Sequence, residues 1–480
     1  MSTRKKEANA LSQVTSRWGH AIVVGAGFGG LLAARVLSDY FERVTVLEQD
    51  FVTVNTGQRS GVPQARHVHA LLARGSIIVE ELFPGVSEEL AAMGAPVFDL
   101  AQHGRVLLPT GWAPRFPIGL PIQTFTRVAL EQCLRQRVMQ LRGVTITSGF
   151  RVTGLLLSIS PGRKTVDGVR GRFRDSPANP GIAGQEEVFE ADLVVNASGK
   201  TSALRTWLTE AGIRPPSPRI VEGNLSYSSR CYSMPQKSSD SDWRTTAELT
   251  YAPTIRCGGV INEVEGRRWL VTLIGADGEK TPVDENGFLE YVRTLRNPLF
   301  AQCVENAVPI GPIYRAVKLN NSWTPYHRMW RWPDRLVCVG DAICTLNPVY
   351  GQGMTVAAVQ VKALRGCLEK HRERGELAGM ARKFQKSAAR ATRIPWIMAT
   401  SSDLAWTSRK NRPVFARLTH WYFDRLLDVM PVDSPTYQRF SLTAQALRGP
   451  AGLAHPHTIV KILRLSLRRT VRGRMKLDLS

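Results

Sequence analysis

The sequence predicts an α/β protein with one discontinuous domain, a sheet-rich lobe inserted into it, and a helical C-terminal region. A short apolar run, a glycine-rich turn, a helical stretch and a second apolar run follow one another at 20–50, which is a βαβ pattern. A second strand, turn and long helix are expected at 335–372. The patterns at 20–50 and 335–372 are expected to belong to one domain. Strand-like runs such as 268–274 lie between them and are expected to form the inserted lobe.

The individual elements follow from hydrophobic spacing and from the positions of glycine and proline. We expect strands at 20–24, 44–48, 143–157, 187–197 and 335–339, and helices at 31–41, 64–82, 126–142 and 352–372. Prolines interrupt 105–124, so short strands or loops are expected there. The stretch between 157 and 187 is expected to be a hairpin or a loop excursion.

These elements divide the chain into five segments. We expect a disordered leader at 1–18, the first part of the α/β domain at 19–204 with an insertion near 85–125, the sheet lobe at 205–330, the second part at 331–400, and a basic helical region at 401–480.

The charge balance is unusual, while the rest of the composition is ordinary. The chain has 63 Lys and Arg against 40 Asp and Glu, a net charge of +23, with 43% hydrophobic residues. Such an excess attracts anionic surfaces without identifying a partner. The seven cysteines form no CxxC pair, which argues against a disulfide framework or a zinc site. No apolar run approaches the roughly 18 residues of a membrane span. We therefore expect a cytoplasmic protein with no metal site and no nucleic-acid partner.

The first chemical signal is Gly25-x-Gly27-x-x-Gly30, between an expected strand and an expected helix. In a Rossmann-type unit, Gly25 allows the tight turn, Gly27 lets the backbone approach a pyrophosphate, and Gly30 permits close helix–strand packing. Glu48 ends the next strand, where a carboxylate accepts the hydroxyls of an adenosine ribose and repels a 2′-phosphate. A mere tight βα turn is the simpler alternative. The context favours dinucleotide binding.

The second signal, RLVCVGDAICTLNPVYGQGMT at 335–355, favours FAD over NAD. Asp341 follows Gly340 at the end of a strand, where an acid can accept hydrogen bonds from ribityl hydroxyls. Gly351 and Gly353 lie at the start of the next helix. Their backbone N–H groups can face the flavin pyrimidine edge, which becomes negatively charged on reduction. The alternative is an aspartate that caps a helix.

Together, these motifs resemble the single-component FAD-dependent monooxygenases of the para-hydroxybenzoate hydroxylase type, over roughly residues 19–400. Thr126-Arg127-x-x-Leu130-Glu131 resembles the family's Ser-Arg-x-x-Leu helix, which implies that Arg127 lies close to FAD. The resemblance also brings Arg66, expected at the start of a helix, towards the cofactor. Ser198 departs from the family, which usually has Asp at this turn, so the approach of the nicotinamide is in question.

A narrower resemblance points to the bacterial flavin epoxidases of polyether biosynthesis, which epoxidise alkenes of long polyketide chains. It rests on Gly61–His69, on Asn347–Gly353, on Glu265-Gly-x-Arg-Trp269, and on the Ala-Thr-Ser-x-Asp stretch at 399–403. Tyr350 lies inside the loop that is expected to face the flavin.

The resemblance implies a reaction. NAD(P)H reduces FAD as a transient reductant, since no second glycine fingerprint is present. O₂ then adds at flavin C4a, and the hydroperoxide transfers one oxygen atom to a hydrophobic secondary metabolite bound in the sheet lobe. Alkene epoxidation is favoured, because it needs no strong general base and the sequence offers no identifiable catalytic pair. The alternatives are an aromatic hydroxylase of the same fold and a flavin-dependent prenyl-chain reductase.

The C-terminal segment 457–480 has two interpretations. Val460, Leu463, Leu467 and Val471 form one helical stripe, and Lys and Arg residues cover the remaining faces. This pattern is typical of an interfacial helix that makes peripheral contact with an anionic membrane. A helix docked on the protein, with a solvated basic face, fits the pattern as well.

Overall fold

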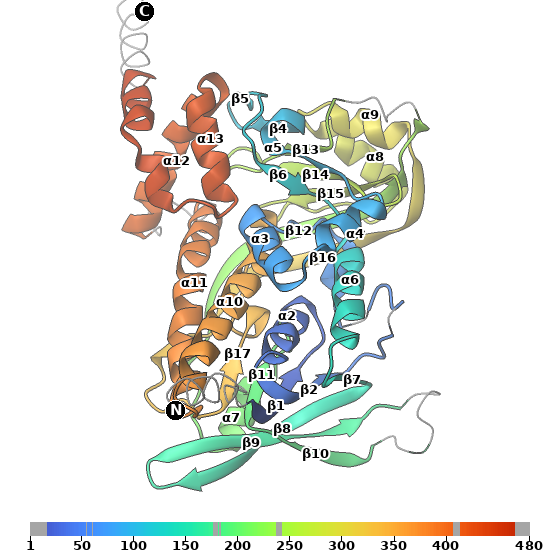
Figure 1. Cartoon of the computed structure of the whole chain (residues 1–480). Helices are drawn as coiled ribbons and strands as arrows, with labels where there is room; N and C mark the ends of the chain where they lie inside the picture. Colours follow the sequence, from blue (N-terminus) through green and yellow to red (C-terminus); the bar gives the residue numbers. More distant parts are fainter. Residues whose placement is uncertain are drawn as a thin grey trace, which may run out of the picture.

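The computed structural model describes residues 17–465 apart from 54, 60, 176–180, 182–183, 237–241 and 407–412. In Figure 1, a parallel sheet and its helices form the middle of the molecule, and a larger sheet lies above them. Helices of the C-terminal part run along one side. The predicted α/β architecture with a sheet lobe and a helical C-terminal region is confirmed.

The central sheet unites strands from both ends of the predicted discontinuous domain. Within the described residues it has five strands in the order β17-β11-β1-β2-β7, all parallel. Their buried apolar residues alternate little, as expected for strands covered on both faces. Trp18, assigned to the leader by the sequence, is the first residue of β1. The bounds are β1 Trp18–Val24, β2 Phe41–Glu48, β7 Val144–Ser148, β11 Leu193–Asn196 and β17 Leu336–Cys338.

Helices from distant parts of the sequence cover this sheet. α10 packs against α2, α3 and α11, so that residues near 30 and near 360 share one hydrophobic core. The predicted helix at 352–372 matches α10, and that at 126–142 contains α6. The bounds are α2 Phe28–Leu37, α3 Ala73–Leu82, α6 Arg127–Met139, α10 Gln352–Arg372 and α11 Met380–Leu404.

The helix predicted at 64–82 is wrong in its first half. The short 3-10 helix η1 (Pro63–Arg66) covers only the start of the expected helix, and α3 begins at Ala73. The residues between them bind the sheet lobe instead: the Val68 N–H donates to Thr272 Oγ1 over 3.0 Å. Long-range bonding therefore replaces helical bonding here, and Arg66 ends η1 rather than opening a helix.

The segment between β7 and β11 forms a second, smaller sheet. β8 (Phe150–Ser160) and β9 (Arg163–Phe173) pair as an antiparallel hairpin, and β10 (Glu186–Glu190) adds to β9. The predicted hairpin between 157 and 187 is present, although its first strand begins earlier.

The upper sheet is the predicted lobe. The described residues place eight strands in the order β18-β16-β12-β15-β14-β13-β4-β5. α8 and α9 cover one part of it with Phe288 and Phe300 fully buried. β4 comes from the insertion near 85–125 and pairs in parallel with β13, so this part of the insertion belongs to the lobe. The bounds are β4 Gly104–Leu108, β5 Gly111–Trp112, β12 Arg219–Ser233, β13 Thr245–Glu248, β14 Cys257–Val264, β15 Arg268–Gly275, β16 Val308–Trp323, β18 Cys344–Thr345, α8 Glu285–Thr294 and α9 Leu299–Glu305.

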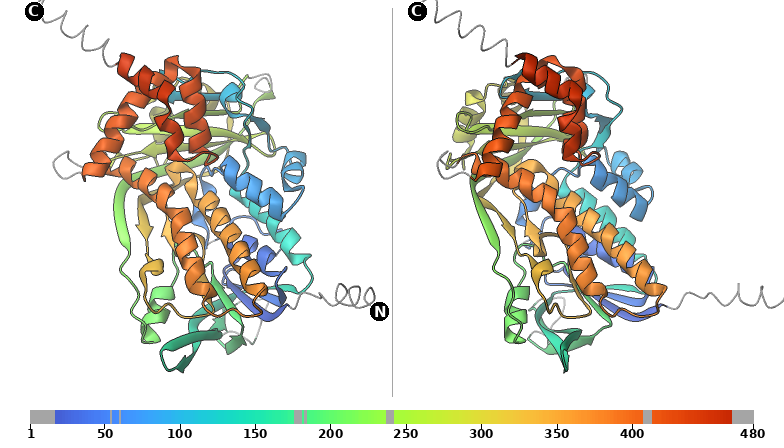
Figure 2. Two further views of the ribbon diagram at one scale, coloured as in Figure 1. Left: turned by 60° about the vertical axis from the view of Figure 1, so that its left-hand side comes forward. Right: turned by 90° about the vertical axis from the view of Figure 1, so that its left-hand side faces the viewer.

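The C-terminal helices pack on the lobe. α11 crosses the expected boundary at 400, and α12 (Val414–Val429) and α13 (Ser434–Ala444) follow (Figure 2). Leu426, Met430 and Tyr437 form a core with Leu108 of β4. No helix among the described residues is both long enough and apolar enough to cross a membrane.

Residues 456–465 form a further helix, and the rest of the predicted tail lies outside the described residues. The helix docks through Thr458 and Ile462, which are buried, whereas Val460 and Leu463 are exposed. Lys461 Nζ lies 3.0 Å from the Asp433 carboxylate at the start of α13. The described part of the predicted stripe, Val460 and Leu463, thus faces outward, and a different face makes the contact with the protein.

Candidate active site

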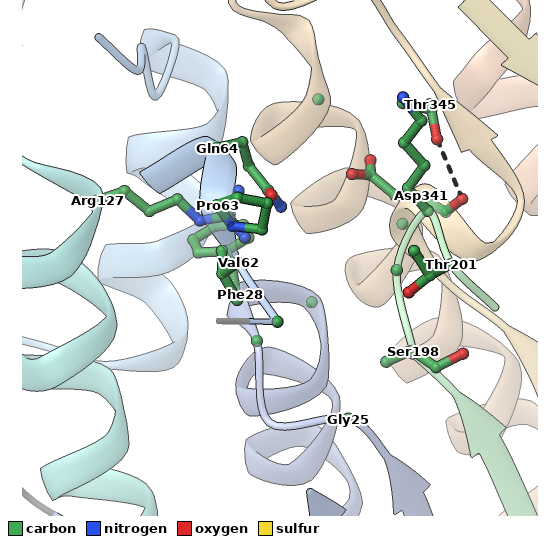
Figure 3. A pocket seen from close by; sticks show the side chains of 18 of the residues that line it. Gly25, Phe28, Val62, Pro63, Gln64, Arg127, Ser198, Thr201, Asp341 and Thr345 are labelled. Atoms are coloured by element: carbon green, nitrogen blue, oxygen red, sulfur yellow. Dashed lines mark hydrogen bonds between the residues drawn. The ribbon is translucent and has the colours of Figure 1, made fainter. Parts of the chain in front are cut away.

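A cavity of about 730 Å³ lies between the central sheet and the lobe. In Figure 3, Arg127, Val62, Pro63 and Gln64 stand on one side and Asp341 on the other. Every predicted cofactor-binding residue except Gly30 lines it: Gly25, Gly27, Glu48, Arg66, Arg127, Gly340, Asp341, Gly351 and Gly353.

The glycine turn has the geometry that a dinucleotide requires. Gly25 has φ +102°, and a Cβ there would lie 2.7 Å from the Ala197 carbonyl oxygen. A Cβ on Gly30 would lie 1.9 Å from the Gly25 oxygen, so Gly30 serves the packing of α2 rather than the cavity. A Cβ on Gly27 would meet nothing closer than 4.0 Å, which leaves this point open to a ligand. The N-terminus of α2 faces that space and suits a pyrophosphate.

Glu48 is buried at the edge of the cavity and is already engaged. Its Oε2 accepts the Ala26 N–H over 2.7 Å and Arg59 Nη1 over 3.2 Å, and its Oε1 accepts the Asp50 N–H over 2.9 Å. A carboxylate offers about four acceptor positions. Glu48 therefore stabilises the turn and retains capacity for a ribose hydroxyl.

A buried charge network joins this turn to α6. Arg59 Nη2 lies 2.6 Å from Glu131 Oε2, and Arg127 Nε lies 2.8 Å from Glu131 Oε1. Burial raises the pKa of Glu131, but Arg127 and Arg59 together bring it down to about 2. The sequence interpretation missed Arg59, because no local pattern connects it with a carboxylate 72 residues away.

Asp341 presents an acceptor to the cavity. Within the described chain, no group donates a hydrogen bond to its carboxylate; Thr345 Oγ1 instead reaches its main-chain oxygen over 3.4 Å (Figure 3). Burial raises the pKa of Asp341, and the positive charges of Arg127 and Lys200 oppose that shift. An orphaned carboxylate beside the open face of Gly353 fits the hydroxyls of a ribityl chain.

The lobe supplies the opposite wall of the cavity. Tyr227, Ile313 and Tyr314 line it, and the Arg66 guanidinium lies 4.5 Å from the Tyr314 ring centroid. Burial, with a smaller contribution from Arg66, lowers the pKa of His67 to about 4. His67 Nδ1 is 2.8 Å from Ser229 Oγ. This wall combines aromatic surface with a histidine that stays neutral at physiological pH.

Ser198 also lines the cavity, at the turn after β11. Its Oγ donates to Asn196 Oδ1 over 2.7 Å, and Asn196 Nδ2 donates to Ser202 Oγ over 2.9 Å. The Ser198 hydroxyl thus stabilises the turn through hydrogen bonds within the turn itself. No carboxylate from this turn enters the cavity.

Comparison with known proteins agrees with this geometry. The family described as "FAD binding domain" matches residues 20–376. Protein Rv3254 of Mycobacterium tuberculosis is 31% identical over 94% of this chain and 95% of its own length. Kynurenine 3-monooxygenase of Salinispora tropica is 25% identical over 74% and 73%. Squalene epoxidase 1 of Arabidopsis thaliana is 24% identical over 76% and 62%.

Solved structures share the fold at low identity. A flavoprotein/dehydrogenase from Cytophaga hutchinsonii superposes with a TM-score of 0.64 at 13% identity, covering 94% of this chain and 99% of the other. PqsL of Pseudomonas aeruginosa, described as a probable FAD-dependent monooxygenase, gives 0.59 at 18%, over 83% and 99%. Its glycine turn, its orphaned aspartate and the family match over residues 20–376 show that the chain belongs to the FAD-binding domain family and is a flavoprotein that uses FAD.

Proposed function

We propose that this flavoprotein is a monooxygenase that transfers one oxygen atom from O₂ to an alkene of a hydrophobic secondary metabolite, forming an epoxide. One observation carries the proposal. The cavity that holds the FAD-binding segments is continuous with the Tyr227, Ile313 and Tyr314 wall of the lobe. A hydrophobic substrate bound against that wall would lie beside the flavin ring of FAD.

The weakness of the available bases favours epoxidation over hydroxylation of a phenol. His67 and His69 line the cavity, and burial lowers their pKa values to about 4 and about 3. Such groups are poor proton acceptors at neutral pH, and an effective general base has a pKa near the working pH. Alkene epoxidation needs no such base. The similarity to squalene epoxidase 1 supports this assignment, and the similarity to kynurenine 3-monooxygenase supports the aromatic alternative.

The roles of the chain follow from its geometry. The turn at Gly27 and the N-terminus of α2 would hold the pyrophosphate, Asp341 the ribityl chain, and the backbone at Gly351 the ring edge. When bound and reduced, FAD supplies the activation of O₂. With FAD and substrate bound, the walls that the two sheets supply would limit the access of water and so the unproductive loss of oxidising equivalents.

We propose NAD(P)H as a reductant that binds transiently. The chain has one glycine fingerprint, and FAD would occupy it. Reduction of the flavin, followed by stopped-flow absorbance, is expected to be faster with substrate than without it. Tight binding of NAD(P)H to the resting protein in calorimetry would contradict this.

The decisive experiment is product analysis with ¹⁸O₂. The FAD-loaded protein is incubated with NADH or NADPH and a matched panel of polyenes and phenols, and the products are examined by mass spectrometry. One ¹⁸O atom in an epoxide supports the proposal. Labelled phenols alone would favour the hydroxylase, and saturated, unlabelled products would favour the prenyl-chain reductase.

We also propose that the enzyme is cytoplasmic and makes peripheral contact with membranes. α12 exposes Val414, Leu418 and Trp421 at 68%, 63% and 55%, spaced to share one helical face. The docked helix at 456–465 exposes Val460 and Leu463 as well. Exposed apolar groups on a chain of net charge +23 match the chemistry of an anionic lipid surface.

A further inference from the structure

Behind the cavity wall, Asp403 of α11 is a carboxylate that is only 3% exposed. Its Oδ1 accepts the Tyr350 hydroxyl over 2.9 Å, and its Oδ2 accepts Asn321 Nδ2 over 2.5 Å and Asn347 Nδ2 over 3.2 Å. Among the described residues, Asp403 has no ion-pair partner. Three neutral donors therefore compensate for the burial of this group.

These donors come from two elements that meet at the cavity. Asn321 belongs to β16 of the lobe, whereas Asn347 caps the short 3-10 helix η5 (Pro348–Tyr350) and Tyr350 is its last residue. Asn321 Oδ1 also accepts the Asn347 N–H over 2.8 Å. Asp403 thus joins α11, the lobe and the η5 loop at one point.

The η5 loop carries residues that face the cofactor cavity. Pro348 and Gly351 line the cavity, and Gly351 adopts φ +61° directly before α10 begins. Tyr350, between them, is turned towards Asp403 and is not part of the lining. The side chain at 350 therefore anchors the loop, while its neighbours present backbone to the ligand.

The surroundings leave little room for another arrangement. A Cβ on Gly223 of β12 would lie 2.9 Å from both Asp403 Oδ2 and Asn347 Nδ2. Burial raises the pKa of Asp403, and the three donors oppose that shift. Burying a carboxylate is costly compared with an apolar side chain. Its value here lies in accepting three hydrogen bonds in fixed directions, since removal would leave three donors unpaired.

We propose that Asp403 is a positioning residue for FAD, which fixes Pro348 and Gly351 against the cofactor by holding Asn347 and Tyr350. It touches neither the cofactor nor the substrate. The sequence signal for it is the Ala-Thr-Ser-x-Asp stretch at 399–403, to which no role attaches without the fold.

The test compares Asp403→Ala with Asp403→Asn in apoprotein reconstituted with FAD. The alanine variant is expected to bind FAD about tenfold or more weakly, with an altered absorption spectrum of the bound flavin, because loop donors lose their acceptor. The asparagine variant is expected to stay within about threefold of wild type, because its amide can accept from Asn321 and Asn347 and donate to Tyr350. Quenching of flavin fluorescence measures the affinity.

Asp433→Ala is the matched control. Asp433 is also a buried aspartate, 6% exposed, but it caps α13 far along the C-terminal region. Its loss is expected to lower the melting temperature and to leave the Kd for FAD unchanged. A folded Asp403→Ala protein with wild-type Kd and spectrum would overturn the proposal, since Asp403 would then be structural only.

Two further outcomes are decisive. If Asp403→Asn binds FAD as weakly as Asp403→Ala, the charge matters rather than the positioning, and the proposal fails. If Asp403→Ala does not fold, Tyr350→Phe and Asn347→Ala replace it, since each removes one donor. Both are expected to weaken FAD binding about threefold or more, and wild-type affinity in both would overturn the proposal.

Discussion

Arg127 and Glu131 form an ion pair one turn apart on α6, with Nε and Oε1 separated by 2.8 Å. The same Glu131 oxygen accepts the Phe28 N–H over 3.3 Å at the start of α2. The pair therefore connects the residue that the family resemblance brings to FAD with the turn that would hold the pyrophosphate. Arg59 completes the network from the other side of the carboxylate.

Glu131→Gln is expected to destabilise the apoprotein strongly at neutral pH. The buried Arg59 and the partly buried Arg127 lose their common counter-charge, and breaking a buried pair costs about 3–5 kcal/mol. Urea unfolding of wild type and variant at pH 7 measures the difference. A change of less than about 1 kcal/mol, as for an exposed pair, would contradict a buried network.

The stability of wild type and of Glu131→Gln is expected to depend differently on pH. The pKa of Glu131 in the folded protein is about 2, below its ordinary 4.5. Its contribution to the free energy of unfolding is therefore complete above about pH 4.5 and is lost as the pH falls towards 2. The difference in the free energy of unfolding between wild type and Glu131→Gln should therefore narrow as the pH falls through this range. A constant difference would show that the Glu131 carboxylate of the folded protein is already protonated at low pH, which contradicts a lowered pKa.

Asp341→Ala is expected to separate cofactor binding from stability. Its carboxylate receives no hydrogen bond within the described chain, so its removal relieves a burial cost and should not lower the melting temperature of the apoprotein. The affinity for FAD should fall about tenfold or more, since hydrogen bonds to a charged group are worth about 1.5–3 kcal/mol. Melting curves with and without FAD, beside a titration, test both parts. If Asp341→Ala binds FAD with the affinity of wild type, Asp341 is not a cofactor-binding residue.

Glu48→Ala is expected to weaken FAD binding and to lower stability together. The carboxylate accepts three hydrogen bonds within the protein in addition to its predicted role at the ribose. The loss of FAD affinity should be about tenfold or more. Retention of FAD during gel filtration of dilute protein gives the measurement, with Glu48→Gln as the isosteric control. If Glu48→Ala retains as much FAD as wild type, the carboxylate at the end of β2 does not bind the ribose.

Trp421→Ala combined with Leu418→Ala is expected to reduce binding to anionic vesicles. Both side chains are more than half exposed on α12, so the folded protein should keep its melting temperature and its FAD affinity. Sedimentation with anionic and neutral vesicles at low and high salt measures the effect. Equal binding by wild type and variant, or none by either, would exclude α12 as a membrane contact. A parallel deletion of residues 457–480 tests the tail separately.

Local patterns in the sequence predicted the turns and helix starts that line the cavity. The turn at Gly25 and the helix after Gly351 could be predicted because backbone conformation and helix starts depend on neighbouring residues. The same local logic located α10, whose bounds at 352–372 agree with the prediction. It failed at 67–72, where hydrogen bonds to the lobe override helical spacing.

Only the tertiary structure shows which buried side chains support the site from behind. Arg59 and Glu131 are 72 residues apart, and Asp403 and Asn321 are 82 apart, so no periodicity or spacing joins them. The strand β4 likewise joins the lobe through its pairing with β13, more than a hundred residues later. The sequence by itself determined a fold that binds FAD, because its glycines and strand ends act locally. The buried charges and the anchoring of the η5 loop arise only where distant segments pack together and exclude water.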